Sequence, residues 1–130
     1  MLNGHDHLYA HYRPLDPSGK FDAQRGITEF IVGTGGETLD PVVTTPVTSG
    51  SSETNMEDPS GNTKFNAENL VAGTGDYWGV MALTLNQNGY AWHFESALQG
   101  PVNNGQWPAV APTGSYTDKG QGACHGPVNR

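Results

Sequence analysis

The sequence contains one cysteine, Cys124, among its 130 residues, so the chain cannot form an internal disulfide. The thiol is either free or paired with a cysteine of another polypeptide. No run of about 18 apolar residues is present, which excludes a transmembrane helix. The first residues do not show the basic segment followed by an apolar segment that is typical of a signal peptide. A signal peptide is therefore not visible, and we expect the chain as given to be cytoplasmic.

Charged residues are also scarce, at 15%, and hydrophobic residues make up 35%, both below the averages for soluble domains. Six basic residues stand against 13 acidic ones, which gives a formal charge of −7. An acidic chain of this kind is poorly suited to nucleic acid or to an anionic membrane, and we predict neither as a partner. A phosphate-bearing substrate remains compatible with this charge, because bound metal ions would supply the positive field.

Glycine and proline are abundant instead, with 18 and 9 residues. This composition is typical of strands joined by long loops, and we predict a mainly β fold in one domain with a modest core. Residues 27–32 have apolar side chains on both faces, which predicts a strand buried on at least one side. Residues 80–86 and 90–96 alternate in character around Asn88-Gly89, which predicts a hairpin.

Weaker signals complete the predicted organisation. Residues 1–3 resemble the end of a buried strand whose beginning lies outside this chain. A short strand is expected at 69–72 and another near Tyr116. Residues 8–26 are predicted to form a loop with several turn signals. Residues 37–67 are predicted to form a long loop or insertion, either a plain linker or a lid on the substrate side.

Two histidines lie two positions apart in Gly4-His5-Asp6-His7, directly after a short apolar segment. At a junction between a strand and a loop, both imidazoles can be directed at one point, and histidine is the commonest metal ligand among side chains. The alternatives are a pair of surface histidines beside an aspartate, or Asp6 as a helix N-cap. We therefore treat His5 and His7 as candidate metal ligands.

Three separated blocks of sequence carry a resemblance to a known family. They are GHDHLY with RPLDPSG and GITEFIVGTGG between residues 4 and 36, WGV with LTL and YAWHF between 78 and 94, and YTDKGQGACH at 116–125. In order and spacing they resemble the C-terminal portion of the calcineurin-like metallophosphoesterases. The resemblance is closest to secreted bacterial members related to purple acid phosphatases.

The resemblance implies the C-terminal strands of an α/β/β/α sandwich, incomplete in this chain, and metal-dependent hydrolysis of a small phosphoester substrate. In that family two divalent ions, for which iron, zinc and manganese are plausible, bind phosphate oxygens and activate a water. His5 and His7 would each ligate one metal, and Asp6 would not coordinate. Tyr9 and His11 are candidates for the substrate side, although many relatives have Glu-Arg where this chain has Ala10-His11.

Several motifs of that family are missing. Its Asp-x-His, Gly-Asp-x-x-Asp and Gly-Asn-His-Asp/Glu blocks precede the two histidines, whereas Gly75-Asp76 and Gly61-Asn62 only begin like two of them and follow the histidines. Two imidazoles cannot hold a binuclear centre, because hard cations need further carboxylates and waters. We therefore predict that the chain alone is inactive. We also expect it either to need a complementing upstream polypeptide or to self-associate through exposed edges.

The alternative function is a stand-alone β-rich module that binds carbohydrate or a protein without catalysis. Trp78, Trp92 and Trp107 could stack on a sugar, but packing in the core is the commoner fate of such residues. We interpret His93 as a partly exposed strand residue. Cys124 and His125 lack the companions that a zinc site needs.

Overall fold

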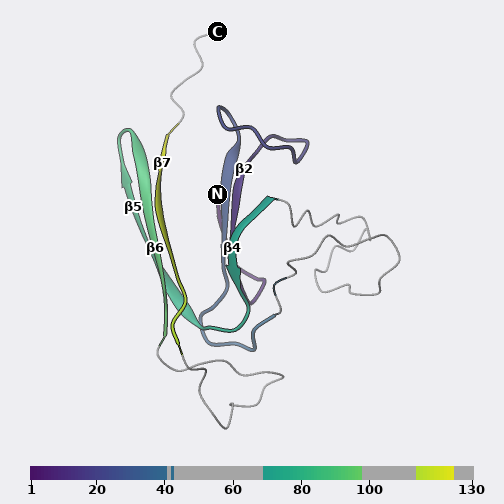
Figure 1. Cartoon of the computed structure of the whole chain (residues 1–130), viewed down its shortest axis with the longest axis vertical. Helices are drawn as coiled ribbons and strands as arrows, with labels where there is room; N and C mark the ends of the chain where they lie inside the picture. Colours follow the sequence, from purple (N-terminus) through teal and green to yellow (C-terminus); the bar gives the residue numbers. More distant parts are fainter. Residues whose placement is uncertain (41, 43–68, 98–113, 125–130) are drawn as a thin grey trace, which may run out of the picture.

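The computed structural model describes residues 1–40, 42, 69–97 and 114–124, and its strands form two β-sheets (Figure 1). The first sheet contains β1 (Leu2–Asn3), β2 (Tyr9–Leu15), β3 (Ile27–Val32) and β4 (Leu70–Thr74), in the order β1-β3-β2-β4. The second sheet contains β5 (Gly79–Asn86), β6 (Gly89–Ser96) and β7 (Thr117–Ala123), in that order. The predicted mainly β fold is confirmed. No helix among the described residues has the length and apolar character needed to cross a membrane.

The prediction of a loop over residues 8–26 is wrong in its first part, where β2 forms the centre of the first sheet between β3 and β4. Tyr9 and Ala10 are both fully buried although they lie on opposite faces of the strand. A strand covered on both faces has no alternation of polar and apolar residues, so the periodic signal is absent. Pro14 lies near the end of the strand, where the pairing register with β3 shifts, a position that proline tolerates.

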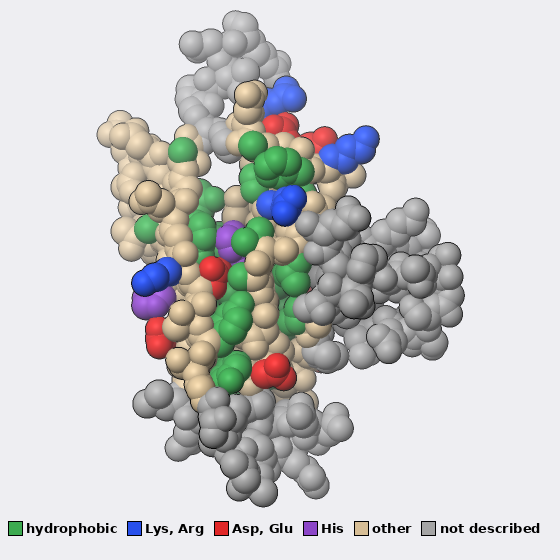
Figure 2. All heavy atoms as spheres, in the orientation of Figure 1, with side chains coloured by type: hydrophobic (Ala, Val, Ile, Leu, Met, Phe, Trp, Pro, Cys, Tyr) green, Lys and Arg blue, Asp and Glu red, His purple; other side chains and the backbone are tan. Residues whose placement is uncertain are grey.

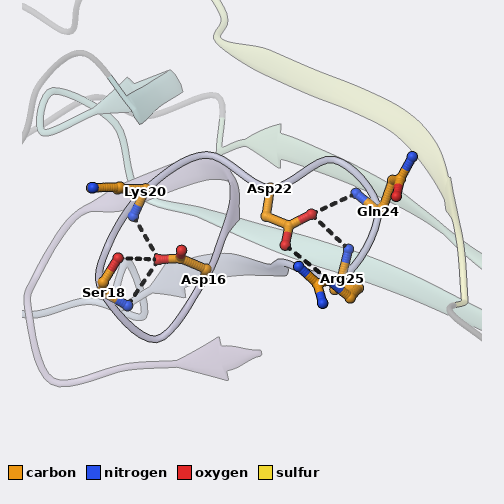
Figure 3. Close-up of polar contacts among 6 residues, drawn as sticks. All are labelled: Asp16, Ser18, Lys20, Asp22, Gln24 and Arg25. Carbon is orange, nitrogen blue, oxygen red and sulfur yellow. Dashed lines mark hydrogen bonds and ion pairs between the residues drawn. The ribbon is translucent and has the colours of Figure 1, made fainter. Parts of the chain in front are cut away.

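The rest of that segment is a loop, and two aspartates shape it (Figure 3). Asp16 accepts hydrogen bonds from the backbone N–H groups two and four residues later, at 2.8 and 2.9 Å. Asp22 does the same for the N–H groups two and three residues later, both at 3.0 Å. Gly19 has a φ of 78°, a left-handed conformation that glycine adopts without strain. The Gly19 N–H donates to the Asp16 carbonyl at 2.9 Å, so the turn signals in this segment correspond to a turn at Asp16–Gly19.

The remaining strand predictions agree with the structure in position. β3 has the predicted bounds, and β4 and β7 lie within two residues of where strands were expected. β1 pairs in parallel with β3. However, Leu2 is 54% exposed, so the prediction of a buried strand at residues 1–3 is wrong in the described structure. Residues 41 and 43–67 of the predicted loop at 37–67 lie outside the described residues.

The hairpin of β5 and β6 is confirmed, with its turn one residue earlier than Asn88-Gly89 indicates. Asn86 faces Gly89 in the ladder, so Gln87 and Asn88 form the two-residue turn. Gly89 belongs to the strand. A Cβ atom there would lie 2.5 Å from the carbonyl oxygen of Gly122 on β7. Glycine is needed at this position because the neighbouring strand approaches closely, a requirement that the local sequence pattern does not reveal.

The two sheets pack face to face, and hydrophobic side chains gather between them (Figure 2). At the centre, the rings of Tyr9 and Phe94 stack with their centroids 4.0 Å apart. Such aromatic pairs contribute about 0.5–1.5 kcal/mol beyond the burial of their surface. A second cluster, built on Leu8, Ala10, Tyr12 and Ile31, covers the other face of the first sheet. The central strand β2 is thus buried on both faces, while the outer face of the second sheet is exposed around His93 and Glu95.

Candidate functional site

The two candidate metal ligands lie in the loop that joins β1 to β2. The loop is tightened by a hydrogen bond of 2.8 Å from the Leu8 N–H to the Asp6 carbonyl. It also packs against the end of β3, where a Cβ atom on Gly33 would lie 1.9 Å from the Asp6 carbonyl oxygen. In contrast, a Cβ atom on Gly4 would have no neighbour within 4 Å. The loop therefore depends sterically on the glycine that ends β3 and not on the glycine of its own motif.

The ring of His7 is oriented by the segment that follows β3. Its Nδ1–H donates a hydrogen bond of 2.9 Å to the carbonyl oxygen of Thr38, because a carbonyl can only accept. The His7 backbone N–H donates to Asp40 Oδ2 at 3.0 Å, and the Asp40 N–H donates to the His7 carbonyl at 2.9 Å. In the neutral ring the proton is therefore on Nδ1, and the lone pair on Nε2 is left to act as a ligand.

His5 is exposed and has a φ of 82°. Among the described residues it is the one non-glycine residue with positive φ. A left-handed conformation costs an L-residue about 1–2 kcal/mol relative to the right-handed one. Strain of this kind is concentrated at functional sites. His5 is thus held in an unfavourable backbone conformation two residues before His7.

The acidic residue Glu37 interacts electrostatically with His7. Glu37 is exposed, and its pKa is lowered by the hydrogen bond from the Thr38 N–H, with a smaller contribution from the charge of His7. Within the described ranges no group of three or more histidine, cysteine, aspartate or glutamate side chains is close enough to hold a metal ion. Imidazole nitrogens suit zinc or iron, and a metal ion bound by His5 and His7 would need further ligands.

The structure places the substrate-side candidates, Tyr9 and His11, between the two sheets. Tyr9 is fully buried and His11 is 7% exposed. Both contact Asp118 on β7: the Tyr9 hydroxyl donates to Asp118 Oδ2 at 2.6 Å and the His11 Nδ1–H donates to the same oxygen at 3.1 Å. The Trp92 Nε1–H is a third donor, at 3.0 Å. We call these four residues the Asp118 cluster.

Burial dominates the electrostatics of the Asp118 cluster. It lowers the pKa of His11 below the ordinary value of 6.5, and the neighbouring carboxylate opposes this shift only partly. Burial also raises the pKa of Tyr9, and the hydrogen bond to Asp118 adds to the effect. At neutral pH both residues are therefore uncharged donors to one carboxylate. The arrangement suits a polar clamp between the sheets, because the four side chains come from β2, β6 and β7.

Glycines on β7 make room for Trp92 of this cluster and for its neighbour Tyr90. Gly120 faces Trp92 and Gly122 faces Tyr90 in the pairing of β6 with β7. A Cβ atom at either glycine would lie 2.4–2.5 Å from the facing ring. The indole of Trp92 can therefore lie over the strand and reach Asp118. The alternation Asp118, Gly120, Gly122 is the sequence signal that could have pointed to this cluster.

The other candidate residues are placed as follows. Trp92 belongs to the Asp118 cluster, and the Trp78 Nε1–H donates to the Glu37 carbonyl at 2.8 Å. Trp107 and His125 lie outside the described residues. His93 is an exposed strand residue, as interpreted from the sequence, and its Nε2 lies 3.0 Å from Glu95 Oε2. Cys124 is exposed, with a free thiol.

Comparisons with protein-family models, with curated proteins and with solved structures found no match to this chain.

Proposed function

We propose that this chain is the C-terminal part of a metal-dependent phosphoesterase, in which His5 and His7 supply two ligands to a pair of divalent ions. The observation that carries the proposal is the hydrogen bond from His7 Nδ1–H to the Thr38 carbonyl. Histidines that bind metals nearly always donate their second ring N–H to a carbonyl or carboxylate, which fixes the ring and its tautomer. The resemblance of the three sequence blocks to metallophosphoesterases supports the same function.

The backbone conformation of His5 is consistent with the same proposal. Histidine, asparagine and aspartate are the non-glycine residues found most often at positive φ, and each is less favourable there than glycine. The observed φ of 82° is understandable if the imidazole is needed at this position. We infer that the strain is retained because the loop presents both rings for metal binding.

The finer description of the fold belongs to the same proposal. We infer that the two sheets are the C-terminal strands of an α/β/β/α sandwich, a view supported by their face-to-face packing through an aromatic core. When bound, the metal ions would polarise the phosphoryl group and lower the pKa of a bound water. The role of this chain is to hold the two histidine ligands in a fixed orientation. Carboxylates that complete the site would come from a complementing upstream polypeptide, so we expect no turnover by the chain alone.

The test compares zinc and manganese binding by calorimetry in the unmodified chain, in a His5→Ala/His7→Ala variant and in a His93→Ala variant. His93 is the matched control because it is an exposed histidine outside the loop. We expect the double variant to bind zinc about tenfold more weakly or worse, since both ligands are lost, and the control to bind as the unmodified chain does. Hydrolysis of an aryl phosphate should be absent in all three. Equal affinities in all three proteins would remove the support for a metal site.

A further inference from the structure

The strand β5 forms one edge of the second sheet and pairs, among the described strands, with β6 alone. Its eight residues, GVMALTLN, include no charged residue and no proline. Its register with β6 is unbroken from Gly79–Ser96 to Asn86–Gly89. Charges, prolines, bulges and shortness are the devices by which proteins protect sheet edges. The strand itself has none of them, so within the described ranges of the chain its backbone is open to another strand.

The pairing with β6 decides which backbone groups of β5 face outward. The two-residue turn closes on the pair Asn86–Gly89, so the even-numbered residues of β5 exchange hydrogen bonds with β6 and the odd-numbered ones face the edge. Gly79 confirms this alternation: its N–H donates to the Thr34 carbonyl at 3.3 Å, and its carbonyl accepts from the Thr34 hydroxyl at 2.8 Å. The outward groups of Gly79 are therefore already satisfied.

Three residues remain with outward N–H and C=O groups that have no partner in the described part of the chain: Met81, Leu83 and Leu85. They are placed symmetrically about Leu83. Their side chains lie on the face that looks toward the first sheet, yet Leu83 is 37% and Leu85 is 71% exposed. The first sheet does not cover this edge. Unpaired backbone groups and uncovered apolar side chains thus coincide at Leu83 and Leu85, whereas the Met81 side chain packs against the core between the sheets.

We propose that β5 pairs antiparallel with β5 of a second copy of this chain, about a two-fold axis at Leu83. In this register Leu83 faces its own equivalent, and Met81 faces Leu85 of the second copy. Each of these facing pairs exchanges two backbone hydrogen bonds, and their side chains form one continuous apolar row. On the other face Ala82 lies opposite Thr84, so no charged residue of the strand meets another.

A second copy fits this edge because β5 is complementary to itself. The open backbone groups are symmetric about one residue, which is what an isologous interface requires. The chain carries a net charge of −7, but β5 contributes none of it, so two copies can approach here without like charges in the interface. The other edge of the same sheet, β7, has Asp118 and Lys119. The proposal does not depend on the metal chemistry proposed above.

The first experiment tests the register by disulfide formation in the full chain, with Cys124 replaced by serine. A Leu83→Cys variant should give a covalent dimer under mild oxidation, because facing Cα atoms in such a pair are about 5.5 Å apart. A Met81→Cys variant is the matched control. Its two thiols would be about 13 Å apart, four residues along the strands, and should not form the dimer. Equal dimer yields from both variants would overturn the proposed register.

The second experiment measures self-association of the unmodified chain by sedimentation over a range of concentrations. We expect a reversible dimer, with a dissociation constant raised about tenfold or more by Leu83→Lys, which places two like charges opposite each other. Gln121→Lys on β7 should leave the dissociation constant unchanged. A chain that stays monomeric at all concentrations would refute the proposal, as would a dimer that Leu83→Lys does not weaken. The disulfide yields decide the matter independently if the lysine variant fails to fold.

Discussion

Replacing Asp118 with alanine should remove the polar clamp between the two sheets and strongly destabilise the fold. One oxygen of this carboxylate accepts hydrogen bonds from Tyr9, Trp92 and His11 at 2.6, 3.0 and 3.1 Å. The Asp118 side chain is 15% exposed, so water replaces these contacts only in part. Each donor left unsatisfied costs about 1–3 kcal/mol. With partial hydration we expect a total loss of about 3–5 kcal/mol in the free energy of unfolding.

Urea unfolding followed by tryptophan fluorescence measures this loss, because Trp92 belongs to the cluster. Asp118→Asn keeps the size of the side chain and one acceptor oxygen, so a smaller loss of about 1–3 kcal/mol is expected. Glu95→Gln is the matched control. It lies on the exposed face of the same sheet, where its contact with His93 contributes about 1 kcal/mol or less. If Asp118→Ala unfolds at the same urea concentration as Glu95→Gln, the reasoning on the clamp is refuted.

Three further predictions concern pH, the metal loop and its strain. Burial lowers the pKa of His11 below 6.5. Below that pH His11 therefore binds a proton more readily in the unfolded chain than in the folded one. The free energy of unfolding should fall as the pH drops through 6.5, and His11→Asn should reduce that slope in urea titrations. Gly33→Ala should weaken zinc binding in calorimetry because its Cβ would collide with the Asp6 carbonyl, whereas Gly4→Ala should bind zinc normally; the reverse order would be inconsistent with the loop geometry. His5→Gly should raise the free energy of unfolding by about 1 kcal/mol by relieving the positive φ, yet weaken zinc binding, and a gain of stability in His5→Ala instead would contradict the strain argument.

The elements that could be predicted from the sequence are those defined by local signals. The hairpin of β5 and β6 follows from alternation around a turn, and the strand at 27–32 from its apolar run. In contrast, β2 was missed because burial on both faces removes the alternation. Residues 1–3 were expected to form a buried strand, but β1 is an edge strand of the first sheet and Leu2 is exposed. These errors share a cause, because the burial of a strand depends on the elements that pack beside it and not on its own sequence.

In the candidate site, too, local features could be predicted from the sequence and long-range contacts could not. The two histidines of the metal loop are recognisable from their spacing, but the contact that orients His7 comes from Thr38, 31 residues away. The Asp118 cluster joins residues more than 100 positions apart, such as Tyr9 and Asp118. The glycine alternation on β7 indicates that a large side chain lies over this strand, but it does not identify Tyr9 and His11 as partners, because those contacts arise only when the two sheets pack.

The most direct test of the proposed metal role is an NMR measurement of the ring nitrogen shifts of the histidines while zinc is added. Before zinc, at slightly alkaline pH, His7 should carry its proton on Nδ1, as its hydrogen bond to Thr38 requires. Zinc should then shift the Nε2 resonance of His7, together with a ring nitrogen of His5, and leave His11 and His93 unchanged. A His7 protonated on Nε2, or zinc-dependent shifts confined to other histidines, would contradict the account.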